Sequence, residues 1–262
     1  MIQLLLYETR TGVLILHNFI DLHCHALYEI DDGAKSMDVA KDMLKSAYDD
    51  GIKTICFTPH FKMHHFSGND GIEIYNDKIV RHFNSLVEYA RDTYPDMRLL
   101  LGNEVLFHSD ICESLTSKKC RLIGDTKYVL IEFRPESTIF EIESTLLKLL
   151  RKGYLPILAH IERYFALYKD LSFLQELHRS GVVLQINSIS LEIKFGKTAR
   201  FIKKLLKNSL VDLICTDAHD NELLTPRLST AFEIISKKYD ESLAKNIFFV
   251  NPRKILKNER LL

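Results

Sequence analysis

Two histidines separated by one residue, His23 and His25, end an apolar run that begins at Phe19. If residues 19–25 form a β-strand, alternate side chains point to the same face, so the two imidazoles lie on one side. Two imidazoles together at a strand end suit a divalent metal ion. A strand that ends in two incidental polar residues would show the same pattern, so ligands at other strand ends decide between the two interpretations.

Six of the seven apolar runs that we interpret as strands end in a side chain that can bind metal ions. These side chains are His23, His25, His60, Glu104, Glu132, His160, Asp217 and His219, and Asp32 lies in the loop after the first strand. Each has an ordinary explanation, such as a hydrogen-bonded core histidine or a turn-forming aspartate. Their common position at one end of the strands nevertheless favours a metal site.

The number and type of these side chains constrain the metal. Nine ligands exceed the four of a tetrahedral zinc site and the roughly six of a harder ion. We therefore expect two or three ions that share a bridging carboxylate. The mixture of imidazole and carboxylate favours Mn, Fe or Zn over Ca.

Seven strand-then-helix units are predicted to position these residues. The strands are expected at residues 19–25, 52–58, 99–101, 128–131, 155–159, 182–186 and 211–216. Amphipathic helices lie between them; Ser36 is a predicted cap of the first helix, and Thr138 with Glu141 forms a predicted capping box. Helical crossovers imply parallel strands. Polar residues 61–74 are predicted to form a long loop.

Both a closed (β/α) barrel and an open doubly wound sheet fit this α/β alternation. The candidate ligands favour the barrel, because the chemistry of such barrels lies at the strand ends. No linker rich in Gly, Pro or Ser divides the chain. We predict one domain at residues 19–262, preceded by an arm or extra strand at residues 1–18, which makes a poor signal peptide.

Composition excludes several classes of partner and site. The 262 residues have a formal net charge of +0, which gives no reason to expect nucleic acid or an anionic membrane. No segment reaches the roughly 18 apolar residues of a spanning helix, so no membrane insertion is expected. Five cysteines without a C-x-x-C pair predict reduced thiols and a cytoplasmic location. None has arginine six positions later, as cysteine-dependent tyrosine phosphatases require.

Seven motifs carry a family resemblance. They are Asp21-Leu22-His23-Cys24-His25, Ile30-Asp31-Asp32-Gly33-Ala34-Lys35, Thr58-Pro59-His60, Gly102-Asn103-Glu104, Ile131-Glu132-Phe133, Ala159-His160-Ile161-Glu162-Arg163-Tyr164 and Thr216-Asp217-Ala218-His219. In order and spacing they resemble the PHP (polymerase and histidinol phosphatase) superfamily. They are most similar to the manganese-dependent protein tyrosine phosphatases of bacterial capsule synthesis, the CpsB/YwqE type. Residues 1–18 lie outside the resemblance.

The resemblance implies a distorted (β/α)7 TIM-like barrel, the PHP fold, that holds three divalent metal ions, with Mn expected and Fe or Zn as alternatives. The implied ligand sets are His23, His25, Glu104 and Asp217 for the first ion, Glu104, Glu132 and His160 for the second, and Asp32, His60 and His219 for the third. Glu104 would then bridge two ions.

The implied reaction is hydrolysis of a phosphate monoester by water activated between metal ions. Arg163 is the first candidate to bind phosphate through a bidentate fork. Arg227 is the second candidate, and a solvated loop charge is the alternative there. Asp217 or His219 could assist proton transfer, although a role as ligand is favoured for both.

The resemblance implies a phosphotyrosine protein as partner, namely the tyrosine-rich tail of a membrane tyrosine autokinase that controls polysaccharide export. A small-molecule phosphatase of the histidinol-phosphatase type and a non-catalytic, metal-stabilised scaffold are the alternatives. A basic cluster could meet the anionic tail or simply form the solvated face of a helix. Its members are Lys194, Lys197, Arg200, Lys203, Lys204 and Lys207.

Overall fold

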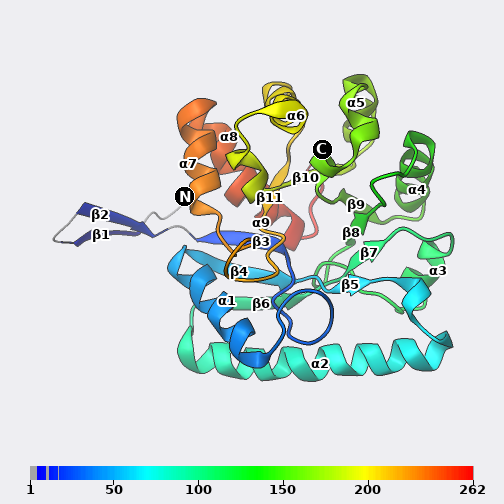
Figure 1. Ribbon diagram of the computed structural model, residues 1–262, viewed down its shortest axis with the longest axis horizontal. Helices are drawn as coiled ribbons and strands as arrows, with labels where there is room; N and C mark the ends of the chain where they lie inside the picture. The colour runs from blue at the N-terminus through cyan, green and yellow to red at the C-terminus, as the bar shows by residue number, and fades with distance from the viewer. Residues whose placement is uncertain (1–4, 10–11, 17, 262) are drawn as a thin grey trace.

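Parallel strands curled around a common centre form the frame of the molecule (Figure 1). The computed structural model describes residues 5–9, 12–16 and 18–261. A six-stranded sheet has the order β11-β10-β9-β8-β7-β5, and a three-stranded sheet has the order β3-β4-β6. The strands are β3 (Phe19–Cys24), β4 (Ile52–Phe57), β5 (His60–Phe61), β6 (Arg98–Leu101), β7 (Glu104–Leu106), β8 (Tyr128–Glu132), β9 (Leu155–Leu158), β10 (Val183–Asn187) and β11 (Leu213–Cys215).

Two strand positions of this frame are each broken into two pieces. Thr58 and Pro59 separate β4 from β5, and Gly102 and Asn103 separate β6 from β7. The first pieces pair with each other, as do the second pieces, so the two broken strands run side by side from one sheet into the other. The amide group of Asn103 donates to the carbonyl oxygen of Pro59 at 2.8 Å and so joins the two breaks.

The ring of strands closes between β3 and the segment after β11. Cys24 forms a parallel bridge with Ala218, and the backbone N–H of His25 donates to the Ala218 carbonyl at 2.8 Å. The backbone N–H of Asp217 donates to the His23 carbonyl at 2.9 Å. When each broken strand is counted once, the nine strands of the two sheets occupy seven positions. The predicted distorted (β/α)7 barrel is therefore confirmed.

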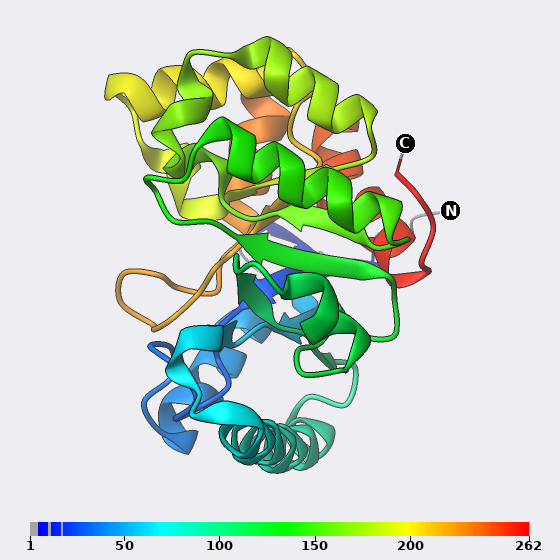
Figure 2. The same ribbon diagram turned by 90° about the vertical axis from the view of Figure 1, so that its right-hand side faces the viewer.

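Helices cover the outside of the strands, with α2 on one side and α4, α5 and α6 on the opposite side (Figures 1 and 2). They are α1 (Met37–Asp49), α2 (Gly68–Thr93), α3 (Ile111–Thr116), α4 (Ile139–Arg151), α5 (Leu171–Arg179), α6 (Gly196–Lys207), α7 (Ser229–Lys238), α8 (Glu241–Lys245) and α9 (Asn251–Leu256). The helices pack on the sheet through buried apolar stripes. In α4, for example, Ile142, Leu146 and Leu149 are fully buried.

The predicted helix caps form as the sequence indicates. The side chain of Ser36 accepts a hydrogen bond from the backbone N–H of Val39 at the start of α1. At the start of α4, Thr138 and Glu141 make a reciprocal capping box. Each cap satisfies backbone donors that have no partner within the helix and contributes about 1 kcal/mol.

An apolar layer fills the barrel below the polar strand ends. On β8, Leu130 is buried in this layer, and Glu132, two residues later, points to the same face. Leu213 and Cys215 of β11 belong to the same layer and are followed by Asp217. Each of these strands therefore places an apolar side chain inside the barrel and a metal-capable one at its mouth.

The predicted long loop at residues 61–74 is wrong in its second half. A short helical turn, η1 (Met63–His65), is followed by α2 from Gly68 onward. Residues 67–70 are exposed, so the first turn of α2 can be polar without losing its helical structure. Similarly, α8, η5 (Asn246–Val250) and α9 extend the helical structure beyond the last predicted helix.

The chain before β3 contains two further strands. β1 (Leu5–Thr9) and β2 (Gly12–Leu16) pair antiparallel in a sheet of their own. Residues 1–4, 10, 11, 17 and 262 lie outside the described residues. The division into an arm at 1–18 and a domain at 19–262 stays a prediction. Across the described ranges, every helix is too short or too polar to cross a membrane.

Candidate metal centre

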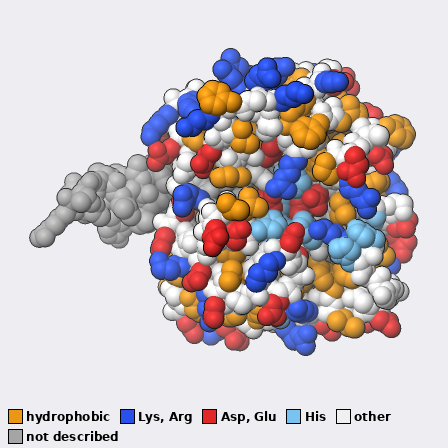
Figure 3. Space-filling view, viewed as in Figure 1, with side chains coloured by type: hydrophobic (Ala, Val, Ile, Leu, Met, Phe, Trp, Pro, Cys, Tyr) orange, Lys and Arg blue, Asp and Glu red, His pale blue; other side chains and the backbone are white. Residues whose placement is uncertain are grey.

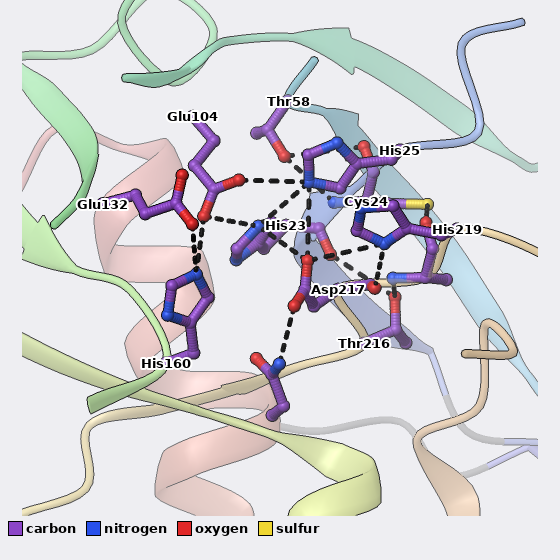
Figure 4. A network of polar contacts seen from close by, with 12 residues as sticks. His23, Cys24, His25, Thr58, Glu104, Glu132, His160, Thr216, Asp217 and His219 are labelled. Carbon is purple, nitrogen blue, oxygen red and sulfur yellow. Dashed lines mark hydrogen bonds and ion pairs between the residues drawn. The ribbon is translucent and has the colours of Figure 1, made fainter. Parts of the chain in front are cut away.

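Side chains from strands far apart in the sequence meet at the mouth of the barrel, where Figure 4 shows seven of the nine predicted ligands converging. Among the described residues there are three groups in which the ligand atoms all lie within 4.8 Å of one another. They are His23, His25, Glu104 and Asp217; His25, Asp32, His60 and His219; and His60, Glu104 and Glu132. The ninth predicted ligand, His160, places its Nε2 2.8 Å from Glu104 Oε1 and 3.6 Å from Glu132 Oε1.

The first group is completely buried. His23 Nε2 lies 3.2 Å from His25 Nε2, 3.1 Å from Asp217 Oδ1 and 3.3 Å from Glu104 Oε1. His25 Nε2 lies 3.4 Å from the same Asp217 atom and 3.4 Å from Glu104 Oε2. Neighbouring ligands of one divalent ion are about 3 Å apart, because each bond is about 2.0–2.2 Å long. The spacing of this group therefore fits a shared cation.

These buried groups strongly shift one another's pKa values. Burial lowers the pKa of His23, but the carboxylates of Glu104 and Asp217 outweigh this effect and raise the pKa to about 10. Burial raises the pKa of Glu104, but His23 and His60 outweigh it and hold that pKa well below its usual range. The two carboxylates are thus ionised inside the protein and require positive charge beside them.

A close pair without a hydrogen bond is the clearest sign that these residues fit a cation. His60 Nδ1 lies 2.8 Å from Glu104 Oε2, and both atoms are buried, yet neither has a hydrogen-bond partner within the described residues. Two donor atoms this close together, neither used in a hydrogen bond, fit one metal ion that both of them bind. Nearby, burial and the charge of Glu104 raise the pKa of Glu132, a repulsion that a cation would relieve.

The group of His25, Asp32, His60 and His219 opens to solvent. His60 Nε2 lies 3.2 Å from Asp32 Oδ1, and His219 Nε2 lies 3.8 Å from the same oxygen. The imidazole of His219 stacks on that of His25 with ring centres 4.1 Å apart. The side chain of Asp32 is 62% exposed. The centre is therefore open to solvent on the side of Asp32.

Asp31 orients two of the ligands without belonging to any of the three groups. One carboxylate oxygen accepts from His25 Nδ1–H at 2.8 Å and from the backbone N–H of His60 at 2.9 Å. A proton held on Nδ1 leaves His25 Nε2 free for a metal ion. The sequence analysis missed this role. The available signal was the adjacent pair Asp31-Asp32, because neighbouring side chains point in different directions and can serve different partners.

Asp21 links the two chain segments that close the barrel. Its carboxylate accepts from the backbone N–H groups of His23 and Thr216 and from the hydroxyl of Thr216. This fully buried group thereby fixes the strand that carries His23 against the segment that carries Asp217. It was also missed, because a lone acid in an apolar strand gives no indication of its partner.

Gly33 allows the first loop to approach β3. A Cβ atom at this position would lie 2.0 Å from the carbonyl oxygen of His25. The same carbonyl accepts from the backbone N–H of Ala34 at 3.0 Å. Only glycine fits at this approach, which places Asp31 and Asp32 over the strand end.

The two predicted phosphate-binding arginines lie in different surroundings. Arg163 Nη2 donates to Asp217 Oδ2 at 2.7 Å, and its side chain is 44% exposed. Arg227 is exposed and lines a separate cavity of about 200 Å3 with Asn221 and Thr225. The contact with Asp217 brings Arg163 to the centre, and the roles of both arginines stay predictions.

This arrangement suits hydrolysis of an anionic ester. A cluster of imidazoles and carboxylates can hold divalent ions, and an exposed guanidinium beside it can bind phosphate oxygens. The thiol nearest the centre, Cys24, is fully buried, and burial raises its pKa. A thiol of this kind stays protonated and is a poor nucleophile.

Comparisons with known proteins agree with this geometry. The protein family described as "Capsular polysaccharide synthesis, CpsB/CapC" matches residues 19–257. The tyrosine-protein phosphatase CpsB of Streptococcus pneumoniae is 34% identical over 246 residues, which cover 92% of this chain and 99% of that protein. The tyrosine-protein phosphatase YwqE of Bacillus subtilis is 30% identical over 227 residues, 86% of each chain.

Solved structures show the same similarity. A chain from the crystal structures of YwqE and CpsB, described there as unique metal-dependent tyrosine phosphatases, superposes with a TM-score of 0.81 and 26% identity, over 93% of this chain and 96% of that one. A phosphotriesterase homology protein of Escherichia coli, 10% identical with a TM-score of 0.53, shares the fold alone. The extent of the family match and the identity to its members place this chain in the CpsB/CapC family of capsular polysaccharide synthesis proteins.

Proposed function

We propose that this protein is a metal-dependent phosphatase that hydrolyses phosphotyrosine in proteins. The observation that carries the proposal is the buried group of His23, His25, Glu104 and Asp217, with the guanidinium of Arg163 2.7 Å from Asp217 at the open side. The names of its relatives CpsB and YwqE as tyrosine-protein phosphatases support the substrate class.

Three divalent ions, most simply Mn, would occupy the centre, and Fe or Zn would suit the same ligands. When bound, such ions polarise phosphate oxygens and lower the pKa of water. The first ion would be held by His23, His25, Glu104 and Asp217, the second by Glu104, Glu132 and His160, and the third by Asp32, His60 and His219. His60 lies close enough to Glu104 to serve the second ion as well.

Arg163 would bind the phosphate group of the substrate. One of its nitrogens donates to Asp217, and its partial exposure leaves the remaining N–H groups available to phosphate oxygens. The contact with Asp217 fixes the guanidinium, so little side-chain freedom is lost on binding. Arg227 would meet the substrate only farther from the centre, in the loop after His219.

His219 has a defined tautomer that fits either of its proposed roles. Its Nδ1–H donates to the backbone carbonyl of Asp217 at 2.8 Å, which leaves Nε2 unprotonated and directed toward Asp32. Burial and the neighbouring His25 lower the pKa of His219 and favour this neutral form. The free nitrogen could hold a metal ion or accept a proton, and binding a metal ion is favoured.

The physiological partner would be the tyrosine-rich tail of a membrane tyrosine autokinase, and the enzyme would act in the cytoplasm. A small-molecule phosphatase of the histidinol-phosphatase type is not favoured, because the named relatives match over most of their length. A non-catalytic scaffold is not favoured either, because it gives no reason for Arg163 to border the ligand groups.

Purified protein should release phosphate from a phosphotyrosine peptide with Mn present and should lose this activity with a chelator. Arg163→Ala should lower kcat/KM about 100-fold, whereas Arg91→Ala, on the outer helix α2, should have no effect. Turnover of histidinol phosphate but not of the peptide would contradict the substrate class. Full activity in the Arg163 variant would contradict its role.

A further inference from the structure

A groove on the surface beside α6 lies outside the ligand groups. It has a volume of about 680 Å3 and lies between η3 (Phe165–Tyr168) and α6. Its aromatic lining comes from Phe165, Tyr168 and Phe201, and its basic lining mainly from Lys197, Arg200 and Lys204. No acidic residue lines it. We refer to it as the α6 groove.

Positive charge is concentrated around this groove. Residues 193–209 carry six basic side chains and no acidic one, although the whole chain has 35 of each sign. In the part of the chain that the structure describes, Lys197, Arg200 and Lys204 form no ion pair with a carboxylate. Figure 3 shows lysine and arginine gathered along the upper edge of this face, where Figure 1 places α6. The net charge of zero therefore hides a local concentration of positive charge.

Aromatic side chains give the groove an apolar wall. Tyr168 stacks on Phe201 with ring centres 4.3 Å apart, and its hydroxyl donates to the backbone carbonyl of Glu162. Phe165 is 65% exposed, and Phe195, just before α6, is 86% exposed. Large exposed aromatic rings beside cations are typical of surfaces that bind partner chains.

The wall of the groove lies close in the chain to the metal centre. Arg163 ends the helical turn η2 (Ile161–Arg163), and Phe165 follows two residues later in the groove wall. A polypeptide bound with its phosphotyrosine at Arg163 and extending toward Phe165 would enter the groove. Neighbouring positions on that polypeptide would meet cations and aromatic rings.

We propose that the α6 groove binds an acidic, aromatic-containing segment that flanks the phosphotyrosine in the protein substrate. The inference rests on the proposed function and adds a second, non-catalytic contact to it. Charge complementarity sets the sign of the occupant, and the ring-lined hollow fits side chains of a polypeptide better than the flat array of lipid headgroups.

The test compares two variants with the same change in net charge. The first is Lys197→Glu/Arg200→Glu/Lys204→Glu, and its control is Lys127→Glu/Lys152→Glu/Lys257→Glu, at three exposed lysines away from the groove. Substrates are a phosphotyrosine peptide flanked by Asp, Glu and Tyr, the same peptide with neutral flanks, and p-nitrophenyl phosphate. Phe165→Ser tests the aromatic wall separately.

We expect the groove variant to lose about tenfold or more in kcat/KM for the acidic peptide, chiefly through KM, and to lose its salt dependence. Turnover of p-nitrophenyl phosphate should stay within twofold of wild type. An equal loss in the control variant, or an equal loss on p-nitrophenyl phosphate, would overturn the proposal. So would unchanged peptide kinetics with a loss of binding to vesicles that contain phosphatidylserine, which would assign the groove to lipid.

If the protein hydrolyses none of these substrates, the proposed function is contradicted, but the proposal for the α6 groove is not. Binding then decides the inference independently, through the fluorescence anisotropy of the labelled acidic peptide without its phosphate. The wild type and the control variant should bind it with equal affinity, and the groove variant should bind it at least about tenfold more weakly. Equal binding by all three proteins would overturn the proposal that the α6 groove binds the acidic segment.

Discussion

At the scale of single residues, the centre packs two buried carboxylates against several imidazoles. Glu104 and Asp217 are ionised and fully buried beside five imidazoles, and each imidazole must leave one nitrogen free to act as a ligand. The residues around them decide which nitrogen is free. The side chains behind the ligands are therefore as important for the proposed chemistry as the ligands themselves.

The carboxylate of Asp31 provides a direct test of this control. Asp31→Asn keeps the size of the side chain but removes the charge that holds the proton on His25 Nδ1. We expect affinity for Mn to fall about 10–100-fold, with a parallel loss of phosphatase activity at limiting metal. Metal titration of the apoprotein measures this. Asp38→Asn, at a 90% exposed carboxylate on α1, is the matched control and should bind Mn normally.

The cysteines should be dispensable. Burial raises the pKa of the Cys24 thiol, although it lies between the two first ligands, and raises that of Cys120 to about 12. We expect iodoacetamide to label the partly exposed Cys112 without loss of activity, and Cys24→Ser to retain activity. Mass spectrometry with a phosphopeptide assay follows both. Inactivation in step with labelling would indicate a thiol nucleophile and would contradict the metal mechanism.

At the scale of elements, the strand ends and the first loop position the ligands. Apolar runs that end in His or an acid were readable from the sequence, because each ligand except Asp32 lies in its strand or within four residues of its end, as His160 lies two residues after β9. The breaks at Thr58–Pro59 and Gly102–Asn103 were not readable, because they depend on a contact between two distant strands. The start of α2 was missed because an exposed first turn can be as polar as a loop.

The close approach at Gly33 is predicted to be essential. In Gly33→Ala, the added Cβ would meet the His25 carbonyl at 2.0 Å, so the loop that carries Asp32 must move away. We expect a loss of about 1–3 kcal/mol in the free energy of unfolding, together with weaker Mn binding. Denaturant unfolding and metal titration measure the two effects.

Gly71→Ala serves as the control, because its nearest neighbours lie 3.7 Å or more from the added Cβ and it sits inside α2. This variant should be slightly more stable, by about 0.5–1 kcal/mol, since alanine favours a helix. A Gly33 variant as stable and as active as the Gly71 variant would show that the loop tolerates displacement.

At the scale of the whole molecule, the ligands come from strands that few backbone hydrogen bonds hold together. β3 meets the segment after β11 through a single isolated bridge, and the two sheets are continuous only through broken strands. The order of the ligands along the chain therefore indicated a barrel, although the contacts that close it could not be read from the sequence. The surroundings of Arg227 could not be predicted, because a loop position ten residues after Asp217 indicates no contact partner; its side chain lines a cavity with Asn221 and Thr225.

Metal binding should consequently stabilise the whole barrel. At an Mn concentration of 100 times Kd, each independent site adds about 2.7 kcal/mol to the free energy of unfolding. For a domain of this size that corresponds to a rise in Tm of roughly 5–10 °C, which differential scanning fluorimetry with and without Mn can measure. Asp217→Asn removes a ligand from the group that bridges β3, β7 and the segment after β11. This variant should therefore lose most of the rise in Tm that Mn produces in the wild type. An equal increase in wild type and variant would mean that Mn stabilises the protein from outside the barrel mouth.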